Sequence, residues 1–345
     1  MKDSGKRNSK NSGVRAFLLD VDHLLENGKP VLRLWCKLPS GKNLVAYYRK
    51  YEPYFYVEPR NHSKADMEEL TDRIRSLEAE GRRPTKVELT EKRYLGLPLK
   101  VLRIYAGNPT DIPKLRDLLK EWKDVKDEYE YGITYYRKFL IDRRLFPMDW
   151  IEIHGNPMTP EVLADEAMDA SDIKPLSGNG TPHPAPPLRV LAFDLEMAEE
   201  KGEERIIMAS FRDNSGLSRA LTYKKVSHPH VEVVPDEKAL LERFMEIVRE
   251  RNPDIIAGYN SDRYDFLRLA ERAESHKVHF HLGRDRKHLV FKKRMRVSSA
   301  QLTGRVHVDL YDFVDNILGS SLMTEVLSLD KVAKEILGEG KLKMR

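Results

Sequence analysis

The sequence NPDIIAGYNSDRYDF, residues 252–266, decides the fold of the second half of the chain. Its apolar residues predict a short buried strand over 254–260, and the spacing of apolar residues after Tyr264 predicts a helix to about Ser275. Three polar residues, Asn260, Asp262 and Asp265, stand between this strand and this helix. We therefore expect a functional site where the strand ends.

The segments around this stretch alternate between strand and helix patterns. Before this stretch come three strand-like segments, at 189–197, 205–212 and 218–224, and a helix with one apolar face, at 236–252. A last strand-like segment, at 305–311, comes after it. The resulting order, β-β-β-α-β-α-β with acids at strand ends, predicts an α/β domain with an RNase H-like mixed sheet.

The first half of the chain predicts a separate α+β domain. Strand-like segments at 16–25, 30–38 and 43–49 are separated by glycine-containing turns, and a β-α-β-β-α-β order follows from residue 53. A Pro/Gly/Ser-rich stretch, SDIKPLSGNGTPHPAPP, separates the two halves. We therefore divide the chain into a disordered basic tail, a first domain, a linker or loop, and a second domain, at residues 1–14, 15–150, 151–187 and 188–345.

Composition limits the possible classes of protein. The chain has 345 residues and a net charge of +5, which permits a polyanionic partner without requiring one. Its single cysteine, Cys36, excludes an intramolecular disulfide framework and a thiolate metal cluster. We find no apolar run of the roughly 18 residues that a membrane span requires. We expect a cytoplasmic, nucleoid-associated protein without a membrane partner.

The spacing of two acids in the strand AFDLEM predicts a metal site. Because side chains alternate along a strand, Asp194 and Glu196 lie on one face. Their repulsion favours a hard cation, Mg²⁺ or Mn²⁺, and two such ions suit phosphodiester hydrolysis. Asp265, at the start of the predicted helix, can supply a third acid. An Asp-x-Glu triplet alone is weak, and Asp262 fits the simpler role of a helix cap, so we leave Asp262 out of the catalytic set.

The ordered segments LAFDLE, NPDIIAGYNSDRYDF and GRVHVDLYDFV resemble exonuclease motifs I and II, and the strand after them, of archaeal-type family-B DNA polymerases. LLDVDHLLENGKPVLRLW, YEPYFYVEP and NPTDIPKLRD similarly resemble, in order, segments of that family's N-terminal domain. The resemblance implies DNA as partner and a 3′–5′ exonuclease with two Mg²⁺ or Mn²⁺ ions. It implies metal-binding and catalytic roles for Asp194, Glu196 and Asp265, and substrate-positioning roles for Asn260 and Tyr264.

The family's third exonuclease motif and its palm, fingers and thumb would lie beyond Arg345. The resemblance therefore implies the N-terminal and proofreading part of a polymerase, with a separate chain supplying polymerase activity and full exonuclease activity. The alternative is a non-catalytic paralogue that binds single-stranded DNA or regulates a polymerase. Because the Asp of the third motif and its positioning Tyr would be missing, we expect weak exonuclease activity or none from this chain alone. If activity were robust, Asp309 or Asp315 would be the first replacement to test, although we expect His307 and Asp309 to form a structural pair.

Two further surfaces are predicted to contact DNA. In the first domain, the residues that resemble the family's template-uracil pocket are Pro53, Tyr54, Asp111, Ile112 and Ile133. His23, GITYY at 132–136 and Lys138 depart from the family's pattern, so we expect binding of single-stranded DNA with only a weak preference for uracil. In the second domain, RDRKHLVFKKRMR at 284–296 is either a DNA-facing surface or a solvated hairpin.

Overall fold

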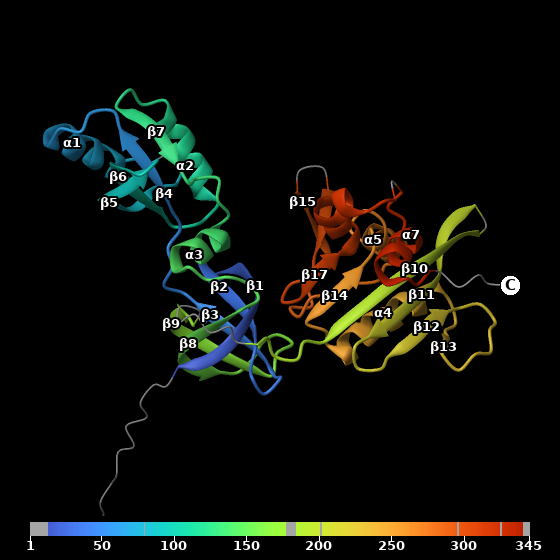
Figure 1. Ribbon diagram of the computed structural model, residues 1–345. Helices are drawn as coiled ribbons and strands as arrows, with labels where there is room; N and C mark the ends of the chain where they lie inside the picture. Colours follow the sequence, from blue (N-terminus) through green and yellow to red (C-terminus); the bar gives the residue numbers. More distant parts are fainter. Residues whose placement is uncertain are drawn as a thin grey trace, which may run out of the picture. The chain divides into compact units, whose positions relative to one another are not determined.

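The structure is a computed structural model that describes residues 13–78, 80–176, 184–200, 202–294, 297–324 and 326–340. The chain folds into two compact units (Figure 1). The first contains residues up to Pro160 and Asp165–Pro184, and the second contains Glu161–Ala164 and the chain from Ala185. Most of the predicted basic tail, residues 1–12, lies outside the described residues, and Val14 already belongs to the first strand.

A closed five-stranded barrel, in the order β1-β2-β3-β9-β8, forms part of the first unit. Its strands are β1 (Val14–Glu26), β2 (Lys29–Lys37), β3 (Asn43–Tyr48), β8 (Asp149–Met158) and β9 (Glu166–Pro175). The predicted antiparallel meander of β1 to β3 is confirmed, with Leu34 opposite both Val21 and Ala46. Helix α3 (Tyr135–Arg143) packs Phe139, which is 0% exposed, into the barrel core.

The predicted linker over residues 151–187 is wrong for much of its length. β8 pairs with β1, and β9 pairs in parallel with β3, so these two strands close the barrel. Pro and Gly residues in and around these strands gave the segment a composition typical of a loop. The strands form because Ile151, Ile153 and Ile173 bury their side chains in the barrel core, which offsets the local turn propensity.

A four-stranded antiparallel sheet with two helices completes the first unit, in the strand order β5-β6-β4-β7. Its elements are β4 (Tyr54–Pro59), α1 (Lys64–Arg75), β5 (Pro84–Tyr94), β6 (Leu97–Ala106), α2 (Asp111–Lys120) and β7 (Val125–Tyr129). The predicted β-α-β-β-α-β order is confirmed. Leu70 of α1 and Leu115 of α2 pack on Phe55 in one shared core, so both helices cover the same face of the sheet.

The second unit is built on a six-stranded mixed sheet in the order β13-β12-β11-β10-β14-β17. Its strands are β10 (Val190–Glu200), β11 (Glu203–Asp213), β12 (Ser218–Thr222), β13 (Val231–Val233), β14 (Ile255–Gly258) and β17 (Val306–Asp309), with a separate hairpin of β15 (Val290–Arg294) and β16 (Val297–Gln301). Its helices are α4 (Glu237–Arg251), α5 (Asp265–Ser275), α6 (Leu310–Phe313), η1 (Val314–Leu318), η2 (Gly319–Ser321) and α7 (Leu329–Leu337). The predicted mixed α/β class is confirmed.

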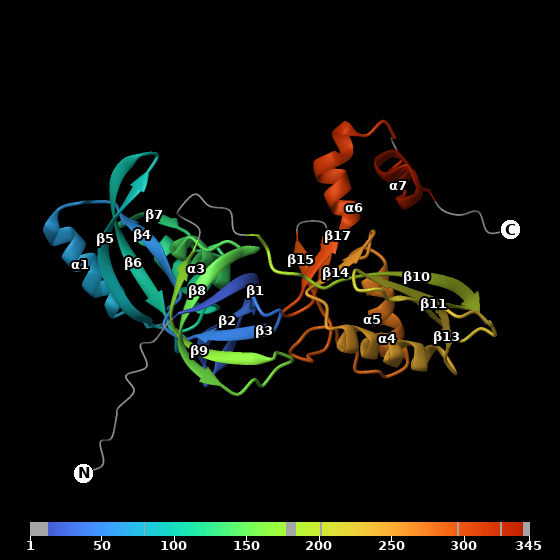
Figure 2. The same ribbon diagram turned by 60° about the horizontal axis from the view of Figure 1, so that its bottom comes forward.

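The helices lie on both sides of this sheet. Figure 2 shows α4 and α5 on one side and α6 and α7 on the other. Phe193 of β10 packs edge-on against Phe244 of α4, with ring centroids 5.4 Å apart, and also contacts Phe266 of α5. The other face of β10 is therefore turned away from this core. Within the described residues, no helix is long and apolar enough to cross a membrane.

Candidate active site

The strand β10 places its two acids on one face, as the period of two predicts. Asp194 and Glu196 are exposed, whereas Phe193 and Leu195 between and beside them are each 6% exposed. Asp194 lies opposite Ser210 and lines a pocket of about 490 Å³. Glu196 lies opposite Met208, next to a bulge, and does not line this pocket. The structure thus brings Asp194 into the pocket and leaves Glu196 beside it.

Asp265 is the first residue of α5, and its carboxylate is buried next to β10. The residue is 4% exposed, and the backbone N–H groups of Leu195 and of Asp265 itself donate to the carboxylate. Burial, followed by repulsion from Asp194, raises the pKa of Asp265 to about 6. Among the described residues, no Lys, Arg or His forms an ion pair with either carboxylate. Asp194 thus lies near enough to Asp265 to repel its carboxylate, and neither acid forms an ion pair within the described part of the chain.

The loop between β14 and α5 makes a sharp turn that brings Asp265 back to the sheet. Asn260 has a φ of +63°, and its carbonyl oxygen accepts the N–H of Tyr264 at 3.0 Å. A Cβ on Gly258 would lie 2.6 Å from the Cβ of Ser261, so only glycine permits this close approach. Asn260 therefore acts first as a turn residue, while Tyr264, which is 37% exposed, stands at the helix start.

Asp309, at the end of β17, holds this loop in place. Its carboxylate accepts the backbone N–H groups of Asn260 at 2.8 Å, Asp262 at 3.0 Å and Tyr311 at 3.0 Å. The predicted structural role of Asp309 agrees with these contacts. Asp309 also lies close enough to Asp265 to contribute to its raised pKa.

Asp262 does not cap α5, contrary to our prediction. The residue before the helix is Tyr264, which makes no capping hydrogen bond through its side chain. Asp262 is 5% exposed and accepts the N–H of Ala300 on β16 at 2.9 Å. His307 lies 3.4 Å from the same carboxylate oxygen, so Asp262 ties the loop to two other strands. Sequence position alone could not show these distant partners.

An acidic group that we did not predict lies beside this loop. Oxygens of Asp262, Asp309 and Asp312 lie within 4.8 Å of one another. Asp312 also forms an ion pair with Arg263 at 2.6 Å. Asp312 was missed because it follows β17 in α6, where no local pattern connects it with the loop. The carboxylates near the end of β14 thus come from more segments than predicted.

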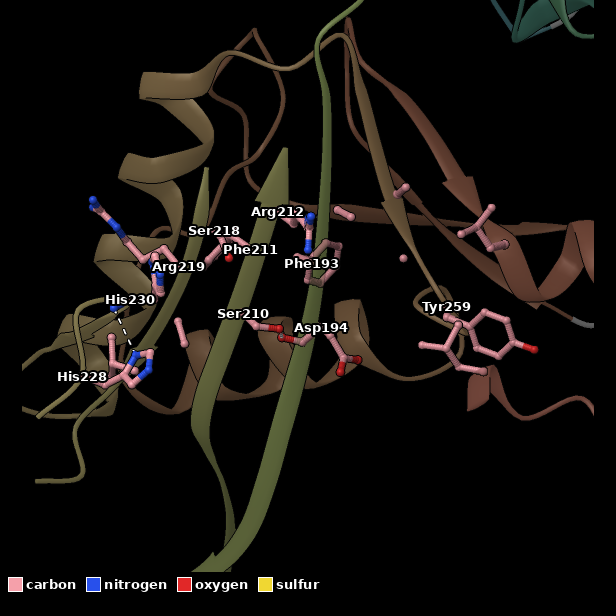
Figure 3. Close-up of a pocket in the computed structure, with 17 residues that line it drawn as sticks. Phe193, Asp194, Ser210, Phe211, Arg212, Ser218, Arg219, His228, His230 and Tyr259 are labelled. Atoms are coloured by element: carbon pink, nitrogen blue, oxygen red, sulfur yellow. Dashed lines mark hydrogen bonds between the residues drawn. The ribbon is translucent and has the colours of Figure 1, made fainter. Parts of the chain in front are cut away.

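The pocket beside Asp194 has an acidic part and a basic part (Figure 3). Asp194, Ser210, Ala220 and Val231 occupy one row across neighbouring strands of the sheet. Arg212 and the adjacent residues His228 and His230 also line the pocket, and Figure 3 shows Asp194 between these histidines and Tyr259. These basic residues were missed, although the alternation of β11 would have placed Arg212 on the same face as Ser210.

Comparisons with known proteins agree with this architecture. The model of DNA polymerase family B, exonuclease domain, matches residues 126–325. The chain belongs to DNA polymerase family B. It is 32% identical over 333 residues to a DNA polymerase of Thermococcus sp. (strain 9oN-7), covering 95% of this chain and 37% of that relative. It is 31% identical over 336 residues to a DNA polymerase of Pyrococcus glycovorans, covering 95% of this chain and 37% of that relative.

A solved structure shows the same similarity. The family B DNA polymerase from the hyperthermophilic archaeon Pyrobaculum calidifontis superimposes with a TM-score of 0.76 and 25% identity, over 93% of this chain and 39% of that chain. The predicted family resemblance is therefore confirmed. The chain spans well under half the length of these relatives and carries the exonuclease-domain region of the family.

The family-B template residues predicted in the first unit fall into two sets, one near Tyr54 and one near α2. Tyr54 is 6% exposed, and its hydroxyl donates to Asp142, while the Lys138 ammonium lies 4.0 Å from the centre of its ring. Pro53 lies directly before it and accepts the N–H of Ala106 at 2.9 Å. The first set is thus tied to both α3 and β6.

The second set includes Asp111 and Ile112, which begin α2. Asp111 forms an ion pair with Arg82 at 3.2 Å, and Ile112, 7% exposed, packs in the core between the helices and the four-stranded sheet. Ile133 is half-buried on the turn before α3. The contacts thus join Tyr54 to Lys138, but place Ile112 in a packed core. The role of these five residues in template binding stays a prediction.

The basic stretch 284–296 includes a buried residue that cannot face DNA. Arg284 is 1% exposed and pairs with Asp254 at 2.8 Å. The later residues form the β15–β16 hairpin, on which Lys292 and Lys293 are exposed. Met295 and Arg296 lie outside the described residues. The described part of the surface that can contact DNA is therefore smaller than predicted.

Proposed function

We propose that this chain binds the 3′ end of a DNA strand and takes part in metal-dependent 3′–5′ hydrolysis of its phosphodiester bonds. The observation that carries the proposal is the uncompensated pair of carboxylates. Burial, together with repulsion from Asp194, raises the pKa of the Asp265 carboxyl to about 6. Such repulsion costs free energy unless a cation neutralises it, and carboxylate oxygens suit Mg²⁺ or Mn²⁺.

In this proposal Asp194, Glu196 and Asp265 hold two such ions. Bound Mg²⁺ or Mn²⁺ would supply positive charge at the attacking and leaving oxygens of the phosphodiester. Asp265 is fixed by its backbone hydrogen bonds, so its carboxylate is oriented before any ion binds. Glu196 is exposed on the same face as Asp194, and its flexible side chain can turn toward the site. Asn260 and Tyr264 would position the strand end.

The pocket beside Asp194 offers a path for the strand. The exposed guanidinium of Arg212 forms no ion pair among the described residues, and it can therefore receive a phosphate. His228 Nδ1 accepts the backbone N–H of His230 at 3.2 Å, which leaves its Nε2 as the donor. Two small residues, Ala192 and Ala220, also line the pocket. One nucleotide unit matches a pocket of about 490 Å³.

Polymerase activity, in this proposal, requires a palm, fingers and thumb, which a partner chain can supply. The first unit would bind single-stranded template near Tyr54 and Lys138, with Pro53, Asp111, Ile112 and Ile133 as further candidates, and would prefer uracil only weakly. This assignment rests on the family membership, since the relatives are DNA polymerases of more than twice the matched length. The proposed place of action is the nucleoid.

A degradation assay tests the proposal. We expect slow shortening of a 5′-labelled single strand with Mn²⁺, lost in Asp194→Asn and in Asp265→Asn and retained in the exposed control Glu274→Gln. A robust rate would mean that a further acid, such as Asp309 or Asp315, completes the site. Binding of the strand without any shortening, unchanged in Asp265→Asn, would contradict the proposal and favour the non-catalytic binding module.

A further inference from the structure

A cluster of three histidines lies between α5 and β15, away from the acidic site. The ring of His279 lies 5.5 Å from that of His281 and 5.3 Å from that of His288, measured between centroids. His279 and His288 are exposed, and His281 is half-buried. We propose that His279, His281 and His288 form a binding site for a borderline divalent transition-metal ion such as Zn²⁺.

The backbone places the three rings on one outward face. The N–H of Leu289 donates to the carbonyl of Phe280 at 2.9 Å, and the two side chains, 5% and 0% exposed, point into the core. Because neighbours along an extended segment alternate, His279 and His281 point outward from one segment and His288 from the other. The buried anchors fix the two segments, so the histidines are held near one another without an ion.

Hydrogen bonds to carbonyls prepare two of the rings as ligands. His279 Nε2 lies 3.2 Å from the carbonyl oxygen of Arg286, and His281 Nδ1 lies 3.1 Å from that of His279. A carbonyl can only accept, so these nitrogens carry the protons. The lone pairs are then on Nδ1 of His279 and Nε2 of His281. Histidine ligands commonly donate their second N–H to a carbonyl in this way.

The donor set selects the class of ion. Imidazole nitrogen suits Zn²⁺, Ni²⁺ and Cu²⁺, whereas Mg²⁺ and Ca²⁺ prefer oxygen ligands. The ligand nitrogens of all three rings do not yet lie within 4.8 Å of one another. Binding therefore requires rotation of the side chains, which the exposure of His279 and His288 permits. A fourth position would be filled by water, as in three-histidine zinc sites.

Basic neighbours set an upper limit on the affinity. Lys277, Arg286 and Lys287 are exposed close by in sequence, and their charges oppose a cation. Because exposed charges are screened by water and salt, they weaken the site without excluding the ion. Binding would join the two segments and stiffen the start of the basic hairpin.

Spectroscopic titration of the full chain with Co²⁺, followed by competition with Zn²⁺, tests the site. We expect saturable 1:1 binding with visible absorption typical of a four-coordinate ion, displaced by Zn²⁺ and weakened about 10- to 100-fold or more in His279→Gln. A matched control replaces another close pair of histidine rings, His228 and His230, whose centroids lie 5.6 Å apart. The control variant, His228→Gln with His230→Gln, should bind as the wild type does.

The double variant Asp194→Asn, Asp265→Asn separates this site from the proposed nuclease site. Retention of Zn²⁺ binding in that variant supports the histidine site, whether or not the chain degrades DNA. Equal affinity in wild type and His279→Gln, or no saturable binding, would overturn the inference.

Discussion

Buried charges are compensated by a partner of opposite sign at one end of strand β14 and are not compensated at the other end. At its start, Asp254 is 0% exposed and pairs with Arg284 at 2.8 Å, and Arg305 lies nearby. At its end, Asp265 is 4% exposed and is repelled by Asp194, another acid. The first end balances its charges with a partner of opposite sign, and the second does not. One short strand thus separates a structural cluster from a candidate active site.

The difference lies in what satisfies each charge. Arg284 donates to the carbonyl of Gly304 at 2.8 Å, and Arg305 to that of Leu282 at 2.8 Å, so carbonyl dipoles and Asp254 compensate the buried guanidinium groups. Burial and the neighbouring Arg284 nevertheless lower the pKa of Arg305. At the other end, burial and the repulsion from Asp194 raise the pKa of Asp265. Uncompensated charge in a folded chain is costly, and it therefore points to a ligand.

The largest expected change in stability comes from removing the ion pair at the start of β14. Arg284→Met removes a fully buried guanidinium and breaks its ion pair with Asp254, so we expect a loss of about 3–5 kcal/mol in the free energy of unfolding. Chemical denaturation measures this loss. Lys293→Met, on the exposed hairpin, should change stability by less than about 0.5 kcal/mol. Equal, small effects of both changes would show that the cluster is not structural.

A smaller loss of stability is expected when the loop after β14 loses its hydrogen bonds to Asp309. Asp309→Ala leaves the N–H groups of Asn260, Asp262 and Tyr311 without their acceptor, at a cost of about 1–3 kcal/mol. Relief of the repulsion on Asp265 offsets part of this cost. Denaturation gives the net value, and amide hydrogen exchange should show faster exchange in residues 259–264. Unchanged exchange there would contradict the anchoring role.

The smallest expected effect is a gain in stability, on replacing Asp265. The folded-state pKa of Asp265, about 6, lies above the value near 3.9 of an unfolded aspartate, so ionisation destabilises the fold. Wild-type stability should fall as pH rises from about 4 to 6, and Asp265→Asn should remove this fall. Without metal, the variant should be more stable by about 1–2 kcal/mol at pH 8, after discounting for partial solvation. Equal stability near pH 4 provides the control, and a less stable variant at pH 8 would contradict the account.

Sequence patterns predicted the features that follow from the periodicity of a single strand or helix. The alternation of β10 placed Asp194 and Glu196 on one face, and the strand-to-helix change placed Asp265 at a helix start. Sequence patterns did not predict contacts between residues that are distant in the sequence. Nothing local to Asp262 shows that it accepts the N–H of Ala300, and nothing local to Arg284 shows that it is buried against Asp254. The barrel strands β8 and β9 were missed because their pairing with β1 and β3, not their composition, makes them strands.

Calorimetric titration with Mn²⁺ tests the central claim, that the uncompensated carboxylates at the end of β14 hold a divalent cation. We expect binding at pH 7.5 that is lost in the double variant Asp194→Asn, Asp265→Asn. It should weaken as pH falls below about 6, because protons then compete for Asp265. Binding that persists in the double variant but disappears in Asp312→Asn would instead place the ion among Asp262, Asp309 and Asp312, and would contradict the assignment.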